Sequence, residues 1–427
     1  MTRGLRETPP TVCLVTSGNL ASNPRLVKEA TALLGAGYRV SVVAADIIRS
    51  LSDFDAAIIG DLGCDVARVK WKHFMVVRVS RAVKQRVARL IARCFSHIPL
   101  NVALRAHHVL TPALGSTACI SRADLYIAHN LAALPAAAAA ARKYGAKLGF
   151  DAEDYHCGEL KKTTANALEL RVRRGIEAKL LPKCQHLTSA SPQISAAYRR
   201  DYGVEMTPIL NVFPLADAPD QPATPQSSSG ELPSLYWFSQ TVGRDRGLEQ
   251  IVDAMGFMST KLRLILRGNA QDEYIHQLRE RAWAAGGQDL VARISLVPVF
   301  APDSMIRLCA PHDLGLALEL SDTTNRDICL TNKAFTYLLA GVPVLLSKTT
   351  AQMQLADELG EAALLVDIFD AQQIARALDD YFADPERQRA ARAEAWRLGR
   401  CPFNWEAEQV KFLEQVSRAL GSELCVS

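Results

Sequence analysis

Short apolar runs alternate with helical stripes and polar loops along most of this 427-residue chain. The first unit opens with the apolar run Thr11–Val15, passes through a polar loop to a helix that begins at Pro24 with Asn23 as N-cap, and ends in the apolar run Tyr38–Ala44. A strand, a helix and a strand in this order form a βαβ unit, which requires a parallel sheet. We therefore expect a doubly wound α/β domain at the N-terminus.

The same pattern continues beyond the first unit, interrupted once by the segment 216–233, which is rich in Pro, Ser and Ala and has no periodicity. We predict an N-terminal domain over 1–215, a linker over 216–233, a C-terminal domain over 234–402 and a C-terminal helix in 403–427 that packs back on the first domain. Two such domains would enclose a ligand-binding cleft. The other predicted strands are Asp124–Ala128, Lys147–Phe150, Pro208–Val212, Leu235–Phe238, Leu262–Leu266, Ile294–Val297, Leu314–Leu318 and Val342–Leu346, and a long helix is predicted over Thr163–Leu180.

The stretch Asp313–Ser347 is typical of a phosphate-binding unit. Its two apolar runs enclose a polar loop and one short helix, with Thr331 as the predicted N-cap and Gly341 in a left-handed cap. In a parallel sheet this arrangement directs unpaired backbone amides and a helix dipole toward the carboxyl edge of the sheet. Lys333, in the first turn, adds a positive charge. Many α/β units share this pattern and bind nothing, so the pattern alone does not establish a site.

Polar residues also follow two predicted strands of the first domain. His129 and Asn130 come after one strand, and the block DAEDYHCGE after the next holds Asp151, Glu153, Asp154, His156 and Glu159. Both strands end at the same sheet edge, so these groups are expected to gather there. The carboxylates could act as a base, orient an acceptor hydroxyl or stabilise positive charge on a sugar ring, and their spacing does not choose among these roles.

The loop after the first strand contains Gly18, which would let a ligand approach the backbone closely, although a tight turn would also use a glycine. The loop lacks the GxGxxG pattern of dinucleotide-binding proteins.

Composition limits the classes of protein further. Charged residues make up 22% of the chain and the net charge is only +4, so a nucleic-acid partner is not indicated. The ten cysteines occur singly, without CxxC pairs or metal-ligand spacing, so we expect no disulfide framework, no bound metal and a reducing cytoplasm. The first residues, MTRGLRETPP, do not resemble a signal peptide, and no run approaches the length of a membrane span. A cytoplasmic protein, at most peripheral on a membrane, is expected.

The segment from Val66 to Ala123 contains no Asp or Glu. Within it, the predicted helix 81–95 places apolar residues on one face and Arg and Lys on much of the other. Such a helix can rest on an anionic membrane surface or receive an acidic acceptor. An ordinary solvated helix face is the alternative. The face residues are Val83, Val87, Leu90, Ile91 and Cys94, and the basic ones are Arg81, Lys84, Arg86, Arg89 and Arg93.

Four motifs in order, SNPRLVKEA, DAED, GRDRG and NKAFTYLLAGVPVL, resemble the retaining GT-B glycosyltransferases related to family 4. The resemblance covers nearly the whole chain. It implies two Rossmann-like domains facing each other across a cleft, a donor of the UDP-sugar or GDP-sugar type held mainly by the C-terminal half, and no metal. It also implies that Arg246 grips the donor diphosphate, with Arg244 nearby.

The chain departs from the family at two places. The two glutamates of the family's E-x7-E motif fall on Ile328 and Thr336. In the family the first contacts the sugar and the second binds the nucleotide ribose, and Glu319 or Asp327 is the candidate to replace the sugar contact. A histidine of many relatives aligns with Glu153, three residues before His156. These departures put the donor contacts and the activity in question.

The leading hypothesis is a retaining, metal-independent hexosyltransferase that moves a sugar from a nucleoside diphosphate to a hydroxyl acceptor in cell-surface glycan or glycolipid assembly. A nucleotide-sugar epimerase of the same fold and a catalytically silent nucleotide-binding or scaffold subunit are the alternatives. The candidate residues are Glu153, Asp154 and His129 for catalysis, His156 and Asn19 for the acceptor, and Gly18, Arg244, Arg246, Gly268, Glu319, Thr331, Asn332 and Lys333 for the donor.

Overall fold

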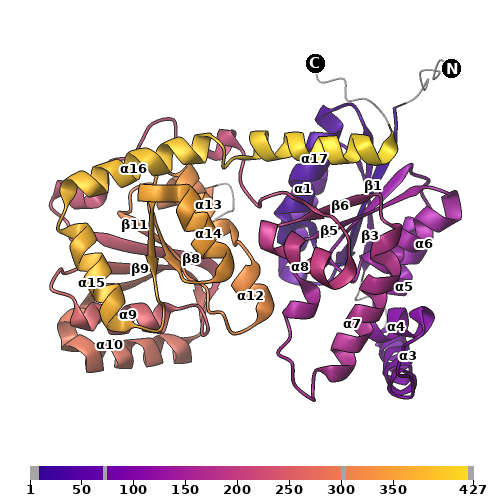
Figure 1. Ribbon diagram of the computed structural model, residues 1–427, viewed down its shortest axis with the longest axis horizontal. Helices are drawn as coiled ribbons and strands as arrows, with labels where there is room; N and C mark the ends of the chain where they lie inside the picture. The colour runs from indigo at the N-terminus through magenta and orange to yellow at the C-terminus, as the bar shows by residue number, and fades with distance from the viewer. Residues whose placement is uncertain (1–8, 71–74, 300–303, 422–427) are drawn as a thin grey trace. The chain divides into compact units, whose positions relative to one another are not determined.

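The computed structural model describes residues 9–70, 75–299 and 304–421. It divides into two compact units, which are labelled by element in Figure 1. Unit 1 comprises Met1–Ile209 and Gln409–Ser427, and unit 2 comprises Leu210–Glu408. Residues 1–8, where a signal peptide was considered, and residues 71–74 of the acid-free segment lie outside the described residues.

Unit 1 is built on a seven-stranded parallel sheet with the order β3-β2-β1-β4-β5-β6-β7. Strands β1 to β3 follow one another toward one edge of the sheet, and strands β4 to β7 follow one another toward the other edge. The topological switch point therefore lies between β1 and β4, and open α/β sheets bind ligands at such points. The strands are β1 (Thr11–Thr16), β2 (Arg39–Asp46), β3 (Asp65–Lys70), β4 (Leu125–His129), β5 (Lys147–Ala152), β6 (His186–Ser189) and β7 (Thr207–Pro208).

Helices lie on both sides of this sheet (Figure 1). The first begins as predicted: the Asn23 side chain accepts a hydrogen bond from Leu26 N at 3.0 Å, Pro24 occupies the first position, and Gly37 after the helix has a left-handed φ of 84°. The helices are α1 (Pro24–Gly35), α2 (Ser52–Leu62), α3 (Met75–Arg93), α4 (Leu100–His107), α5 (Thr111–Ala118), α6 (Leu134–Tyr144), α7 (Ala167–Leu180) and α8 (Pro192–Tyr202), and most of α17 (Trp405–Leu420) also belongs to this unit.

Unit 2 repeats the plan with six parallel strands in the order β10-β9-β8-β11-β12-β13, and its switch point lies between β8 and β11. The strands are β8 (Ser234–Val242), β9 (Arg263–Ala270), β10 (Ile294–Val297), β11 (Leu314–Ala317), β12 (Val344–Ser347) and β13 (Ala363–Val366). The helices are α9 (Leu248–Phe257), α10 (Asp272–Ala292), α11 (Met305–Cys309), α12 (Thr324–Ile328), α13 (Asn332–Leu339), α14 (Thr350–Leu359), α15 (Ala371–Phe382) and α16 (Pro385–Arg400).

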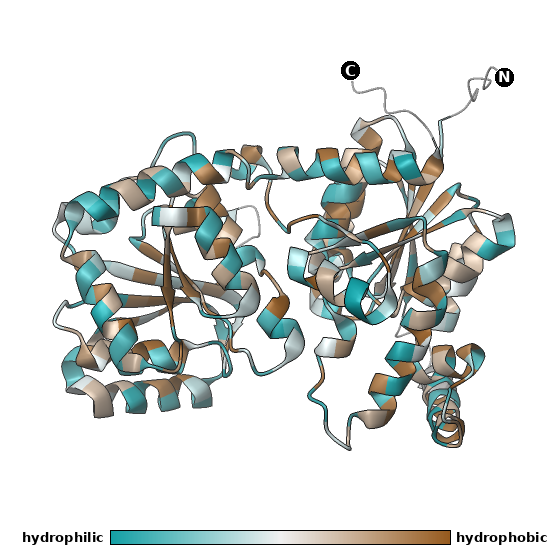
Figure 2. Cartoon of the chain, viewed as in Figure 1, coloured by the Kyte–Doolittle hydropathy of each residue, from teal (hydrophilic) through white to brown (hydrophobic). Residues whose placement is uncertain are grey.

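The strands of both sheets consist mainly of hydrophobic residues, as Figure 2 shows. In unit 2 the core forms around Trp237, Leu266 and Leu316, which are fully buried. The predicted α/β class with two Rossmann-like sheets is therefore confirmed. Among the described residues, no helix is both long and apolar enough to span a bilayer.

Several predicted boundaries are wrong. Where a strand was predicted over Pro208–Val212, the structure has the two-residue β7, which pairs with β6 through Thr207 and Pro208. β7 is the last strand of its sheet, and Pro208 has no N–H to donate to a neighbouring strand. Two helices, α12 and α13, lie where one was expected between β11 and β12. The helix predicted from Thr163 begins at Ala167. The basic helix, predicted over 81–95, ends at Arg93.

The segment 216–233 contains two short 3-10 helices and is anchored to unit 2. The Arg392 guanidinium donates to the Ala223 carbonyl at 2.9 Å, and Gln226 N donates to the Pro311 carbonyl at 3.0 Å. The clustering of contacts assigns the segment to unit 2.

Candidate functional site

A row of polar side chains crosses the sheet of unit 1 at its carboxyl edge. Thr16 of β1 pairs in register with His129 of β4, His129 with Asp151 of β5, and Asp151 with Thr188 of β6. Residues in register on neighbouring strands point to the same face. The Thr188 hydroxyl accordingly donates to Asp151 Oδ1 at 2.6 Å, and His129 Nδ1 lies 3.5 Å from Asp151 Oδ2.

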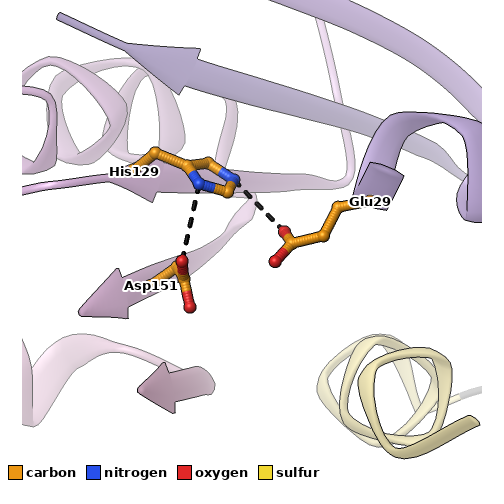
Figure 3. A group of neighbouring side chains, drawn as sticks. All are labelled: Glu29, His129 and Asp151. Atoms are coloured by element: carbon orange, nitrogen blue, oxygen red, sulfur yellow. Dashed lines mark ion pairs between the residues drawn. The ribbon is translucent and has the colours of Figure 1, made fainter. Parts of the chain in front are cut away.

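Helix α1 covers this row with two charged side chains one turn apart, Arg25 and Glu29. The Arg25 guanidinium binds both oxygens of Asp151, at 2.7 and 2.8 Å, and also donates to the Ile209 carbonyl at 2.6 Å. Glu29 Oε2 lies 3.2 Å from His129 Nε2. Figure 3 shows His129 between the carboxylates of Glu29 and Asp151. All four side chains are buried, so the network forms part of the core beneath the site.

Burial alone would favour a neutral imidazole, but the carboxylates around His129 outweigh burial. Glu29 faces one ring nitrogen and Glu153 the other, at 3.2 Å, and together they raise the pKa of His129 to about 10. Burial likewise opposes ionisation of Asp151, yet the Arg25 guanidinium holds the pKa of that carboxyl well below its usual range. Burial raises the pKa of the Glu29 carboxyl, so the Arg25–Asp151 pair is the ionised centre of the network, and His129 is held between Glu29 and Glu153.

Glu29, His129 and Asp151 offer three ligand atoms within 4.8 Å of one another, a spacing that a metal ion could use. Arg25 already occupies both oxygens of Asp151. A guanidinium at hydrogen-bond distance would repel a divalent cation, and a protonated imidazole cannot ligate one. The chemistry of these side chains fits a buried ion-pair network better than a metal site.

Two of the three residues predicted for catalysis, Glu153 and Asp154, lie at the rim of this network, and the third, His129, lies within it. Glu153 is partly exposed, and its Oε1 accepts a hydrogen bond from the Asn23 side chain at 2.7 Å and lies 3.2 Å from His129 Nδ1. Asp154 is also partly exposed. The structure thus brings Glu153 and His129 together, as the sequence indicated, and adds Asn23 as a third member.

The remaining residues predicted for unit 1 have structural partners. Asn19 is buried: its amide donates to Asp55 at 2.8 Å and its carbonyl oxygen accepts from Ile47 N and Ile48 N. His156 is buried as well, with Nδ1 3.1 Å from Glu159 and Nε2 without a hydrogen-bond partner among the described residues. Gly18 is partly exposed after β1, and a Cβ there would lie 3.2 Å from Ser22 Oγ.

In unit 2 the N-terminus of α13 has the features of an anion site. Thr331 occupies the N-cap position, but its side chain does not cap the helix, and its buried hydroxyl has no partner among the described residues. The first-turn amides, which begin at Asn332, have no partner within the helix. Lys333 is buried, forms no ion pair in the described part of the chain, and lies with Nζ 5.7 Å from the centre of the Trp237 ring.

Burial lowers the pKa of Lys333, and the nearby Glu319 carboxylate partly opposes this effect. Arg246 and Arg326 are close enough to lower the pKa further. Lys333, Arg246 and Arg326 therefore share this part of the unit with Glu319, and Arg326 is itself paired with Asp322 at 3.7 Å. An anion bound here would relieve the repulsion among the cations.

The loop Gly243–Gly247 carries Arg246 toward this group. The strand before this loop was predicted to end at Phe238, but β8 continues to Val242 with an irregular register between Phe238 and Thr241. Gly247 has a φ of 76°, and a Cβ there would lie 2.9 Å from Leu318 Cβ, so the turn requires glycine. From α12, the Arg326 guanidinium donates to the Asp245 carbonyl at 2.8 Å and holds the loop in place.

Three other predicted donor residues, Gly268, Arg244 and Glu319, have different surroundings. Gly268 allows close packing, since a Cβ there would lie 2.4 Å from the Ser239 carbonyl oxygen. Arg244 is exposed and donates a hydrogen bond to Gln277. Glu319 is buried at the end of β11, where its backbone N donates to Ser347 Oγ at 2.9 Å.

The two positions at which glutamates were expected are buried. The Thr336 hydroxyl donates to the Asn332 carbonyl at 2.9 Å within its own helix, and Ile328 packs at the end of α12. Asp327, considered as a substitute, instead accepts hydrogen bonds from Thr350 N at 3.0 Å and from the Thr350 hydroxyl at 2.6 Å. Of the two substitutes considered, only Glu319 lies beside Lys333.

The sequence matches no protein-family model and no curated protein. Among solved structures, HepE of Anabaena in complex with UDP-glucose is similar, with a TM-score of 0.68 and 16% identity over 96% of this chain and 99% of HepE. Sucrose-phosphate synthase of Thermosynechococcus elongatus is similar to the same degree, with a TM-score of 0.68, 16% identity and the same coverage. A glycosyltransferase of Rickettsia africae has a TM-score of 0.66 and 11% identity over 97% of this chain and all of its own.

The chain has the GT-B fold. The similar structures are GT-B glycosyltransferases, so the resemblance drawn from the motifs is confirmed at the level of fold. In this GT-B chain both clusters of polar residues lie at the switch points of their sheets, after β1 and β4 in unit 1 and after β8 and β11 in unit 2. These are the positions at which open α/β sheets bind ligands.

Three charged residues of these sites were not predicted from the sequence. Arg25 and Glu29 are opposite charges four residues apart beside the apolar stripe of α1, and that placement was a usable signal for a buried pair. Arg326 lies in a short helix that was read as part of a loop, so no local pattern marked it.

Proposed function

We propose that the protein is a glycosyltransferase that moves a sugar from a nucleoside diphosphate donor to a hydroxyl acceptor, with retention and without a metal. The observation that carries the proposal is the buried Lys333 at the N-terminus of α13, which forms no ion pair among the described residues, next to the Thr331 hydroxyl, which has no hydrogen-bond partner among them. A diphosphate supplies the negative charge and acceptor oxygens that such groups bind. The complexes of Anabaena HepE with UDP and UDP-glucose support a donor of the UDP type.

Each unit contributes a separate part of the reaction in this proposal. In unit 2, Lys333, Arg246 and the first amides of α13 neutralise the diphosphate as its bond to the sugar breaks, and Glu319 binds the sugar. Arg326 positions the loop that carries Arg246. Arg244 and Gly268 are the remaining donor contacts of unit 2, and Gly18 is the donor contact proposed for unit 1.

In unit 1 the carboxylates act on the reacting carbon and the acceptor. Glu153 takes the proton of the acceptor hydroxyl, and Asp154 stabilises the positive charge that develops on the sugar ring. His129, held protonated by the carboxylates around it, orients Glu153 through its Nδ1. Asn19 and His156 shape the acceptor side through the loops that their hydrogen bonds fix.

Arg246→Ala is expected to lower kcat/KM for transfer about 100-fold, because a cation that stabilises a leaving group typically contributes this much. Arg281→Ala is the matched control, since it removes the same charge from an exposed ion pair with Asp253 on the same unit. The measurement is transfer and donor hydrolysis with a panel of nucleotide sugars. Equal activity of the two variants would show that Arg246 does not bind the diphosphate.

The same assay tests the alternatives. A change in the donor sugar without any acceptor would favour a nucleotide-sugar epimerase. Calorimetry that detects no binding of UDP or GDP to the wild-type chain would favour a silent scaffold subunit.

We further propose that α3 contacts an anionic membrane surface, which fits an acceptor used in cell-surface glycan or glycolipid assembly. Its packed face consists of Gln85, Ala88, Arg89 and Ala92, so the opposite apolar face is left uncovered by the described residues. The uncovered side chains are 44–58% exposed: Val79, Val83, Val87, Leu90 and Ile91.

At about 3.6 residues per turn, Arg81 and Lys84 flank this stripe on one side and Arg86 and Arg93 on the other. In Figure 2, α3 carries both hydrophobic and hydrophilic residues. Replacing Leu90 and Val87 by Ser should reduce co-sedimentation with anionic vesicles at least about tenfold, because the apolar stripe supplies the insertion energy. Phe257→Ser, which removes an equally exposed apolar side chain from unit 2, is the control. Equal sedimentation of both variants would remove the membrane assignment.

A further inference from the structure

A cavity of about 340 Å³ lies between α3, α4 and α5, and the proposed transfer reaction does not use it. Since a water molecule in the liquid takes about 30 Å³, the cavity is large enough for a phosphoglycerol group. Its lining contains three cations and no acid: Arg81, Lys84, Gln85, Arg105, His108, Val109, Pro112, Ala113 and Ser116.

The cations that line this cavity have no counter-charge among the described residues, whereas Arg89 of α3 has one. Arg89, on the packed face of α3, is paired with Glu169 at 2.6 Å. Arg81, Lys84 and Arg105 form no ion pair with any residue that the structure describes, and Arg105 donates only to the Asn101 carbonyl of its own helix, at 3.4 Å. Three unpaired cations around one concave surface favour an anionic ligand.

His108 adds a directed donor to these charges. Burial, together with the neighbouring His107, lowers the pKa of His108 to about 4, so its ring is neutral near neutral pH. Its Nδ1 accepts a hydrogen bond from Leu110 N at 3.4 Å, which places the ring proton on Nε2. A neutral N–H donor beside guanidinium and ammonium groups suits a phosphate oxygen.

The position of the cavity indicates which kind of molecule would carry the phosphate that it binds. Arg81 and Lys84 line the cavity and also flank the exposed apolar stripe of α3. A lipid whose acyl chains meet that stripe would bring its headgroup to this flank. We infer that the cavity between α3, α4 and α5 binds the phosphate of an anionic glycerophospholipid headgroup. This inference rests on the proposed membrane contact of α3.

The test compares binding of the full chain to two kinds of phosphatidylcholine vesicle at equal zeta potential. One kind contains phosphatidic acid and the other contains oleic acid, whose charge is a carboxylate. The wild-type chain should bind the phosphatidic acid vesicles about tenfold more tightly or better, because a cavity-bound phosphate gains charge-assisted hydrogen bonds that diffuse attraction does not supply.

Arg105→Ala should abolish that preference while binding to both vesicle types persists, since Arg105 lies on α4 and not on the apolar stripe. Arg86→Ala, which removes the same charge from the far flank of α3, should weaken both interactions equally and retain the preference. A wild-type preference near one, or equal ratios in the two variants, would overturn the headgroup site.

Two further outcomes separate this inference from the proposals beneath it. Binding to neither vesicle type would overturn the membrane contact itself. Binding of soluble glycerol 3-phosphate that is lost in Arg105→Ala, without any vesicle preference, would overturn the lipid source and assign the cavity to a soluble phosphate. Transfer activity on a soluble acceptor should be unchanged in Arg105→Ala, so a failed lipid site leaves the transferase proposal intact.

Discussion

Replacing Arg25 by Met is expected to lower the free energy of unfolding of unit 1 by about 3–5 kcal/mol. The substitution leaves the Asp151 carboxylate and the Ile209 carbonyl buried without the guanidinium that now binds both. A buried carboxylate without its counter-charge is among the costliest defects that a core can contain. Urea unfolding followed by far-UV circular dichroism measures the change.

Tryptophan fluorescence gives an internal control in the same experiment. Four of the five tryptophans, Trp237, Trp283, Trp396 and Trp405, belong to unit 2, so the fluorescence transition should shift much less than the part of the dichroism change that comes from unit 1. Arg89→Met is the matched variant, because it removes an arginine whose pair with Glu169 is partly exposed, and its effect should stay below about 1 kcal/mol. Equal losses of unfolding free energy in Arg25→Met and Arg89→Met would show that the buried network contributes no more to stability than a partly exposed ion pair.

A double variant separates the charge effect from lost packing. Arg25→Met combined with Asp151→Leu removes both members of the central pair, and such replacements of buried pairs by apolar side chains are often tolerated. The double variant should therefore be more stable than Arg25→Met alone. A loss equal to the sum of the two single losses would mean that the two side chains do not act as a pair.

The network also connects the stability of unit 1 to its candidate chemistry. Asn23 caps α1 through its side-chain oxygen and donates to Glu153 through its amide nitrogen. The same helix carries Arg25 and Glu29 into the row of His129 and Asp151. The position of α1 therefore fixes both the buried ion pairs and the orientation of Glu153.

The helices and strands that depend on short-range patterns could be predicted from the sequence. Apolar runs and capping residues located β1, α1, β10 and the start of α13, because each is set by neighbours along the chain. The gathering of His129 and Glu153 at one edge also followed, since parallel strands end on the same side.

Long-range pairings could not be predicted in the same way. Arg25 and Asp151 lie 126 positions apart, and nothing in either local pattern specifies the other. The loop before Gly247 was placed too early because a register irregularity after Phe238 extends β8 through polar residues that resemble a loop. The exposure of the apolar stripe of α3 depends on which face α4 and α7 cover, and the helical periodicity gives only the existence of two faces.

Lys333→Met should weaken binding of UDP about 10–150-fold, while making the free protein more stable. The affinity falls because a hydrogen bond to a charged group contributes about 1.5–3 kcal/mol. Stability rises because Lys333 is buried without an ion pair in the described part of the chain, next to Arg246 and Arg326, and methionine fills a similar volume without a charge. The gain should be about 1–3 kcal/mol, measured by urea unfolding followed by tryptophan fluorescence.

These opposite signs distinguish a ligand-binding lysine from a structural one. Replacing a lysine with a structural role would lower the stability of the protein, as is expected for Arg25. Replacing a group that is kept buried and unpaired for a ligand should instead raise the stability of the protein. Lys261→Met is the matched control: it removes an exposed lysine of unit 2 that pairs with Asp289, and neither UDP affinity nor stability should change appreciably. Lys333→Arg, which keeps the charge, should retain part of the UDP affinity. If Lys333→Met instead destabilises unit 2 and leaves UDP affinity unchanged, then α13 is not the diphosphate site.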